Sequence, residues 1–274
     1  RRPKCWQCCS PNCNSRREVL ADCLKLKACS PVVPLPLAYL DPDVVARLQR
    51  AAAQRPLLLG SFLGDEQRGF VNSLVALGTA EPYDYGKRHL LPFGEFIPPG
   101  FAWFVHAMNI PMGEFARGDL PQPTWRWGGL NWAPNICYED LFGEELARAL
   151  VGEQPAQVMV NFSNIAWFGD TVAQTQHLNI SRLRALELQR PMVRVTNTGT
   201  TALIDHQGRV VSRLPTWTRE VLHTQVSARS GPPTWYARWV SRWGLWPLWV
   251  LGALAIFAPL LLRKSGVALR PVKR

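Results

Sequence analysis

The stretch Asn135-Ile136-Cys137-Tyr138-Glu139-Asp140 joins an apolar run to a polar one, and the rest of the chain is interpreted around it. Residues 130–136 predict a short buried strand, and residues 139–150 predict a helix. A cysteine at a strand end and near a helix N-terminus is expected to have a lowered pKa and a partly accessible thiolate. A covalent catalyst needs such a thiolate, so Cys137 is the candidate nucleophile. The alternative is a buried structural cysteine.

Helical and extended patterns alternate on both sides of this stretch. A helix is expected over residues 41–54, where Asp41 is the N-cap, and a second over residues 174–189. Strands are expected at residues 57–60, 72–77, 157–162, 192–196, 201–205, 210–214 and 220–226. This order predicts a layered α/β domain.

Composition and charge narrow the class of protein. The 274 residues, 47% of them hydrophobic, are enough for a large core. The net charge of +11 is concentrated at the two ends, because residues 1–29 hold seven basic and two acidic side chains and residues 263–274 hold five basic and no acidic ones. The remainder is nearly neutral, so no nucleic-acid partner is expected.

The cysteines are concentrated in a leading segment. Six of the seven lie within residues 5–29, and only Cys137 lies beyond them. Cys5 and Cys8 have the spacing of metal ligands, but no second such pair follows and the first histidine is His89. We therefore expect no metal site and no cofactor, and we interpret residues 1–32 as an atypical leader rich in cysteine and arginine.

A second candidate motif lies upstream of the cysteine. Lys87 and Glu95 are separated by an apolar stretch with proline and glycine, which predicts a loop that holds both charges. A lysine beside a thiolate can stabilise it and a developing oxyanion, and a carboxylate can hold the lysine or relay protons. The alternative is a solvated surface pair. The apolar residues 96–115 that follow are a candidate lid for acyl chains, and His177 is expected to be a hydrogen-bonded helix histidine.

The C-terminal region has the composition of a membrane anchor. Residues 244–262 contain no charged side chain, several tryptophans precede or begin this run, and Arg263 and Lys264 follow it. This pattern predicts one transmembrane helix with an interfacial tryptophan belt over residues 233–262 and a basic cytoplasmic tail over residues 263–274. The body would then lie outside the cytoplasm. The alternative is a buried helix of a soluble protein.

Together, five motifs resemble one family. They are residues 85–98 (Tyr-Gly-Lys-Arg-His-Leu-Leu-Pro-Phe-Gly-Glu-Phe-Ile-Pro), 136–139 (Ile-Cys-Tyr-Glu), 163–170 (Ser-Asn-Ile-Ala-Trp-Phe-Gly-Asp), 184–191 (Arg-Ala-Leu-Glu-Leu-Gln-Arg-Pro) and 197–199 (Asn-Thr-Gly). In this order they resemble the apolipoprotein N-acyltransferases of Gram-negative bacteria, membrane members of the nitrilase superfamily. The resemblance implies an αββα sandwich over residues 33–232, incomplete at its N-terminus, at the inner membrane and facing the periplasm.

The resemblance also implies an activity and its residues. An acyl chain would move from a phospholipid, through a thioester on Cys137, to the α-amine of the diacylglyceryl-cysteine of an apolipoprotein. Lys87 would stabilise the thiolate and the oxyanion, and Glu95 would be an auxiliary carboxylate. Two pairs would bind substrate: Tyr138 and Glu139 shape the pocket, and Trp167 and Phe168 line the acyl opening or pack in the core.

The leader departs from this family. Its triad glutamate follows a Trp-Pro motif, and Ser30 stands at about that place here. The family's first strand and helix are unrecognisable in residues 1–32, which we interpret as the product of a shifted reading frame or a mistaken start. The chain as written is therefore expected to be weak or inactive. Two alternatives stay open: a membrane-anchored nitrilase-like amidase, and a non-catalytic membrane protein whose leader binds metal or a partner.

Overall fold

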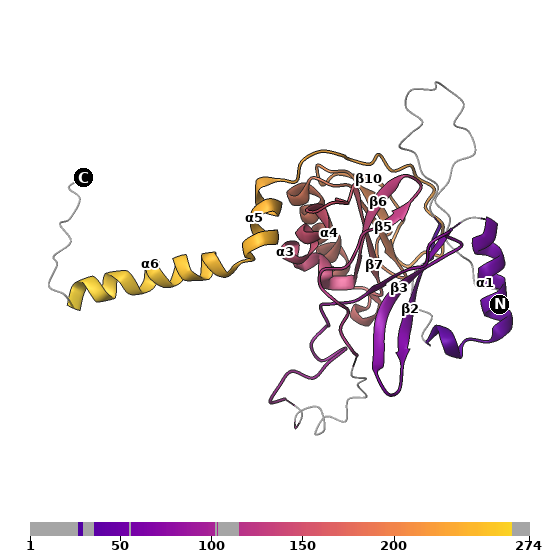
Figure 1. Ribbon diagram of the computed structural model, residues 1–274, viewed down its shortest axis with the longest axis horizontal. Coiled ribbons are helices and arrows are strands. Elements are labelled where there is room, and N and C mark those ends of the chain that lie inside the picture. The colour runs from indigo at the N-terminus through magenta and orange to yellow at the C-terminus, as the bar shows by residue number, and fades with distance from the viewer. Residues whose placement is uncertain (1–26, 30–35, 55, 102, 104–114, 265–274) are drawn as a thin grey trace.

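The computed structural model describes residues 27–29, 36–54, 56–101, 103 and 115–264, and its centre is a pair of stacked β-sheets (Figure 1). The first sheet has the order β1-β2-β3-β4, formed by Lys27–Cys29, Leu57–Asp65, Gly69–Leu77 and Tyr83–Gly86. The second has the order β10-β9-β8-β7-β6-β5, formed by Val210–Arg213, Ala202–Ile204, Met192–Thr196, Val158–Ser163, Leu130–Ile136 and Trp125–Trp127.

Both sheets are mixed. In the first, β1 is parallel to β2, whereas β2, β3 and β4 form an antiparallel meander whose first turn closes at Asp65 opposite Gly69. In the second, β6, β7 and β8 are parallel and carry antiparallel neighbours, β5 on one side and β9 and β10 on the other. The parallel centre aligns the C-terminal ends of β6, β7 and β8 at one edge, where Cys137 follows β6.

Strand alternation decides which side chains fill the space between the sheets. Leu58 and Leu74 of the first sheet join Trp132, Val160 and other residues of the second in one buried cluster. Their neighbours along the strands point the other way, because successive side chains of a strand face opposite sides. The two sheets therefore share a continuous apolar core.

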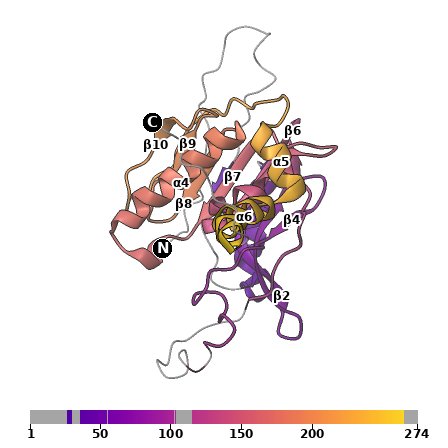
Figure 2. The same ribbon diagram turned by 90° about the vertical axis from the view of Figure 1, so that its left-hand side faces the viewer.

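Helices cover the two outer faces. The helix α1 (Pro42–Gln54) packs Ala52 and Leu48 against Leu57 and Leu59 of the first sheet. The helices α4 (Val172–Leu188) and α5 (Trp235–Trp243) pack on the outer face of the second sheet, together with α3 (Gly143–Leu146) and η3 (Ala147–Leu150). Figure 2 shows α4 and α5 in front of that sheet. The layers are α, β, β and α, as the resemblance of the motifs implies.

Three expected elements differ from the structure. Residues 139–150 form no continuous helix but three short turns, η2 (Cys137–Leu141), α3 and η3, since Phe142 has a non-helical conformation between the first two. Residues 220–226 are not a strand, although Leu222 and Val226 are buried, because their alternating pattern reflects packing on the sandwich without ladder hydrogen bonds. The first strand of the sandwich was unrecognisable in the sequence of residues 1–32, and the structure has β1 there.

The C-terminal region also differs from its expectation. The helix α5 ends at Gly244, which has a left-handed φ of 59° and donates its N–H to the Val240 carbonyl, and α6 (Trp246–Lys264) then begins in a new direction. Within the described part of the chain no single helix meets the length and apolarity of a bilayer span, but Trp235–Trp243 and Trp246–Phe257, bent by 86°, meet them as a pair. The single span predicted at residues 244–262 is not confirmed.

Candidate active site

The ends of two strands, one from each sheet, bring the candidate residues together. Lys87 follows β4 directly and Cys137 follows β6 directly. Lys87 lies near enough to the thiol of Cys137 for its charge to lower the pKa of that thiol. Fifty residues of sequence separate the two side chains, so only the stacking of the two sheets places them at one site.

Lys87 and Glu95 form a buried ion pair. The Lys87 Nζ donates to Glu95 Oε2 at 2.7 Å, and Lys87 is only 1% exposed. The same carboxylate oxygen accepts the Leu91 N–H at 2.8 Å, and Oε1 accepts from the Asn72 side chain at 3.0 Å. The backbone of Lys87 is fixed as well, because its N–H donates to the Asn72 carbonyl. This burial excludes a solvated surface pair.

Cys137 has a strained backbone. Its φ is 57°, in the left-handed region, which costs a non-glycine residue about 1–3 kcal/mol unless its surroundings impose it. The carbonyl of Cys137 is held by the Asn161 side-chain amide at 2.8 Å and lies 3.3 Å from the His177 Nε2. Cys137 forms no disulfide, and the residue as a whole is half-buried. It therefore projects from the strand end on a rigid turn.

The expectation of a lowered thiol pKa is wrong. Burial raises the pKa of Cys137, and the charges of Glu95 and Asp140 raise it further, while Lys87 and the Tyr138 N–H lower it. The sequence argument assumed a helix N-terminus beside the thiol. The short turn η2 stands there instead, so it supplies too little aligned backbone dipole to outweigh desolvation.

Glu139 ties the two strand ends together. Its Oε1 accepts the N–H groups of Arg88 and His89 at 2.7 and 3.1 Å, and its Oε2 accepts the Ile136 N–H at 2.7 Å and the Tyr85 hydroxyl at 3.0 Å. Burial raises the pKa of this carboxyl to about 7, although the backbone donors oppose the shift. Glu139 therefore fixes the segment around Lys87 against the segment around Cys137.

Tyr138 lies over the lysine. Its hydroxyl donates to the Leu90 carbonyl at 2.8 Å, and its ring centre lies 5.5 Å from the Lys87 Nζ, within the range of a cation–π contact. Burial raises the pKa of Tyr138 to about 12. Tyr138 and Glu139 are thus the two neighbours of the thiol that contact Lys87 or its backbone surroundings.

The remaining predicted residues lie further out. Trp167 and Phe168, in η4 (Ala166–Phe168), are 82% and 47% exposed, so they are not core residues. Most of the expected lid, residues 102 and 104–114, lies outside the described residues, as do Ser30 and residues 1–26 of the leader. The described part of the expected lid includes Phe101 and Trp103, which are exposed.

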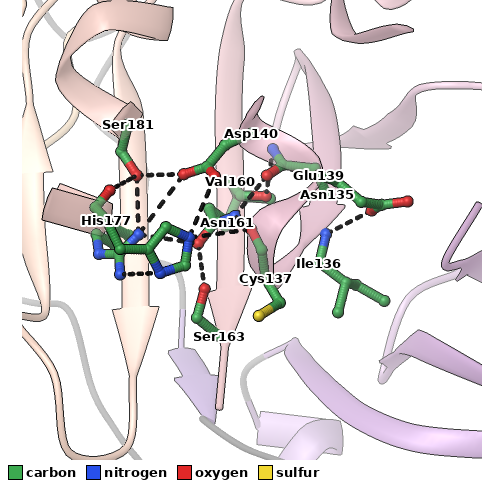
Figure 3. A network of polar contacts seen from close by, with 11 residues as sticks. Asn135, Ile136, Cys137, Glu139, Asp140, Val160, Asn161, Ser163, His177 and Ser181 are labelled. Carbon is green, nitrogen blue, oxygen red and sulfur yellow. Dashed lines mark hydrogen bonds and ion pairs between the residues drawn. The ribbon is translucent and has the colours of Figure 1, made fainter. Parts of the chain in front are cut away.

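A polar network packs against the backbone of Cys137, and only its histidine was predicted from the sequence. His177 is hydrogen-bonded, as predicted, to Asp140 at 3.1 Å. Asn161, Asp140 and Arg194 are all fully buried, and Figure 3 shows Asn161 and His177 on the side of Cys137 opposite to its sulfur. The available signal was a polar residue inside a buried strand: Asn161 in β7 and Arg194 in β8 interrupt apolar runs.

Comparisons with known proteins assign the chain to a family. A family model described as carbon-nitrogen hydrolase matches residues 34–232. An apolipoprotein N-acyltransferase of Verminephrobacter eiseniae is 53% identical over 230 residues, which cover 79% of this chain and 43% of that protein. One of Ralstonia nicotianae is 51% identical over 178 residues, which cover 64% of this chain and 34% of that protein.

Among solved structures, an amidase from Nesterenkonia sp. matches with a TM-score of 0.47 at 16% identity, over 70% of this chain and 67% of that one. The chain spans less than half of the length of the curated relatives named above. The match of the family model covers most of the chain and includes every candidate residue from Lys87 to Phe168. The chain belongs to the carbon-nitrogen hydrolase family of enzymes, and its relatives there at 51–53% identity are apolipoprotein N-acyltransferases.

Proposed function

We propose that this chain transfers an acyl group through Cys137, from a phospholipid to the α-amine of the diacylglyceryl-cysteine at the N-terminus of an apolipoprotein. The observation that carries the proposal is the buried Lys87–Glu95 pair beside the thiol. A buried cation with one carboxylate partner is costly to maintain, so its place next to a nucleophile supports a catalytic role. The names of the curated relatives support acyl transfer to an apolipoprotein, and the phospholipid donor is what the resemblance of the five motifs implies.

The transfer has two steps at one sulfur. In the first, the Cys137 thiolate attacks the ester carbonyl of the phospholipid, the ester C–O bond breaks, and the lysophospholipid leaves with a proton as a thioester forms. In the second, the amine of the acceptor attacks the thioester carbonyl, the amide C–N bond forms, the C–S bond breaks, and the proton that the amine loses returns to the sulfur as the Cys137 thiol is released. Such a sequence predicts ping-pong kinetics.

The other residues have supporting roles in this proposal. Lys87 stabilises the thiolate and the oxyanion of each tetrahedral intermediate, and Glu95 holds the lysine in place by accepting from its Nζ. Glu139 positions the lysine by accepting the backbone N–H of Arg88, and Tyr138 does so through the contact of its ring with the Lys87 Nζ. Trp167 and Phe168, which are exposed, would contact the acyl chains.

A membrane location follows from exposed apolar surface. In α6, Trp249, Leu251 and Ile256 are 78%, 61% and 64% exposed, and such a surface is stable only against lipid or another apolar partner. We propose that residues 233–262 anchor the domain of residues 33–232 to the inner membrane, that residues 263–274 face the cytoplasm, and that the domain faces the periplasm.

The general base is the weak part of the site. A base contributes about 10²–10⁴-fold to such a step, and the family motif places a glutamate where Ser30 stands. We therefore propose that the chain as written acylates Cys137 slowly, and that Ser30→Glu accelerates the reaction.

The test measures acylation of the thiol directly. The full chain in nonionic detergent is mixed with phospholipid, digested with trypsin, and analysed for an acyl mass increase on the peptide of residues 127–148, in which Cys137 is the one cysteine. We expect an adduct that hydroxylamine removes, more of it with Ser30→Glu, and none with Cys137→Ser. No adduct in either chain, with hydrolysis of a soluble amide instead, would favour an amidase; no thiol chemistry at all would favour a non-catalytic protein.

A further inference from the structure

Beneath the nucleophile lies a polar network that the catalytic proposal does not use. Its central residue is Arg194, which is fully buried in β8. One guanidinium nitrogen donates to the His177 Nδ1 at 3.0 Å, and the other donates to the Ser181 hydroxyl at 2.8 Å and to the Asn161 Oδ1 at 3.3 Å. Asp140 balances its charge from 3.7 Å. A buried arginine inside a sheet calls for such partners.

Arg194 fixes the orientation of two neighbours, because a guanidinium can only donate hydrogen bonds. The Nδ1 of His177 must accept, so the ring is in its neutral tautomer with the proton on Nε2. The oxygen of Asn161 must likewise face Arg194, so its amide nitrogen faces away. That assignment agrees with the other contacts of Asn161, whose oxygen also accepts the Ser163 hydroxyl at 2.6 Å.

The donors that this arrangement leaves both reach the Cys137 carbonyl, and each also has a second acceptor, which for the Asn161 amide is Asn135 Oδ1 at 2.6 Å. The Asn161 amide donates to the Cys137 carbonyl at 2.8 Å, and the His177 Nε2–H lies 3.3 Å from that carbonyl and 3.1 Å from Asp140. Figure 3 shows both side chains at the Cys137 backbone while the sulfur points away. The carbonyl belongs to the residue whose φ is left-handed. The network thus holds the strained peptide from the side opposite to the reaction.

We propose that His177, locked as its Nε2–H tautomer by Arg194, is a positioning residue that fixes the Cys137 turn and thereby keeps the thiol within reach of the Lys87 charge. It acts through the backbone and does not touch substrate. This inference rests on the proposed nucleophilic role of Cys137, but the test below reads the thiol and needs neither phospholipid nor acceptor. Its failure is therefore distinguishable from a failure of the acyl transfer.

The experiment is a double-mutant cycle between positions 177 and 87. The rate of alkylation of Cys137 by iodoacetamide near neutral pH is followed on the tryptic peptide of residues 127–148, and the cysteines of residues 5–29 give an internal control for the reagent. The charged groups around the thiol are Lys87, Glu95, Asp140 and Arg194. With His177 in place, Lys87→Met raises the thiol pKa and so lowers the fraction of thiolate, while the remaining thiolate is more nucleophilic. The two effects partly cancel, so alkylation should slow only about three- to tenfold.

The change at position 177 decides the outcome. Gln can donate where Nε2 does and accept from Arg194, so His177→Gln should keep the full effect of Lys87→Met. His177→Leu removes both contacts, so Lys87→Met should then have no further effect. Gln176→Leu, at an exposed position next to it on α4, is the matched control and should leave the effect intact.

Folding of each variant is checked by circular dichroism. If His177→Leu does not fold, His177→Asn replaces it, because the shorter amide cannot reach the Cys137 carbonyl. The proposal is overturned if a folded Leu or Asn variant keeps the natural response to Lys87→Met, or if His177→Gln folds but loses that response.

Discussion

Neutralising Glu95 should be the most damaging single charge change at the site. In Glu95→Gln, Lys87 keeps its place at 1% exposure but loses the one carboxylate to which its Nζ donates. The substitution hardly changes the volume of the side chain. Its effect therefore measures the electrostatic partnership and not the packing.

The size of the effect follows from distance and burial. Two unit charges 2.7 Å apart attract by about 6 kcal/mol at an effective dielectric constant of about 20, before the cost of desolvating both is subtracted. Removing one partner of such a pair leaves the other charge buried, and this typically costs about 3–5 kcal/mol. Lys87→Met together with Glu95→Gln removes both charges, so the double variant should be more stable than Glu95→Gln alone.

The assay is urea unfolding of the full chain in nonionic detergent, followed by tryptophan fluorescence. The control is Arg209→Met, which removes the cation of the Asp205–Arg209 pair at 2.9 Å; the Arg209 side chain is 72% exposed, so we expect a loss below about 1 kcal/mol. Two results would refute the reasoning: a loss for Glu95→Gln as small as that of the control, or a double variant less stable than Glu95→Gln.

Three further predictions concern other contacts of the described residues. The pKa of Glu139 is raised from 4.5 to about 7 in the folded state, so the folded protein binds a proton that the unfolded chain has lost between these pH values. Its free energy of unfolding should therefore fall by about 3 kcal/mol as the pH rises from 4.5 to 7. Urea unfolding at these two pH values should show this loss in the natural chain and not in Glu139→Gln. A Cβ on Gly118 would overlap the backbone oxygen of Gly86, so Gly118→Ala should shift the strand end before Lys87 and cost about 1–3 kcal/mol. Urea unfolding measures this loss, and an unchanged midpoint would contradict it. The Thr234 hydroxyl caps α5 by accepting the Ala237 N–H at 3.1 Å, so Thr234→Ala should cost about 1–2 kcal/mol, also by urea unfolding, and Thr234→Ser should recover most of it.

The layered fold could be predicted because periodicity and packing agree along most of the chain. The helix α1 begins after its predicted cap, where the Asp43 N–H donates to the Asp41 carboxylate, and β6, β7 and β8 lie where apolar runs indicated buried strands. Short edge strands such as β5 gave no such signal, since three residues are too few to show a period.

The sequence indicated which candidate residues would lie together but not their electrostatics. The motif containing Lys87 and Glu95 indicated the pair, and the structure places both beside Cys137. The direction of the thiol pKa depends on how much water the fold removes, and a sequence does not give that quantity. The network around Arg194 was missed for a related reason, because a polar residue in an apolar strand does not reveal its partners in distant elements.

Lys87 and Cys137 are divided between the two sheets, with the amine at the edge of one and the sulfur at the edge of the other. A newly synthesised chain therefore possesses both groups long before it possesses a reactive site. The sulfur acquires its cationic neighbour only when the two sheets dock, and its reactivity toward a small electrophile then reports the closing of the sandwich. The rate of alkylation of Cys137 therefore also measures how far the folding of this protein has progressed.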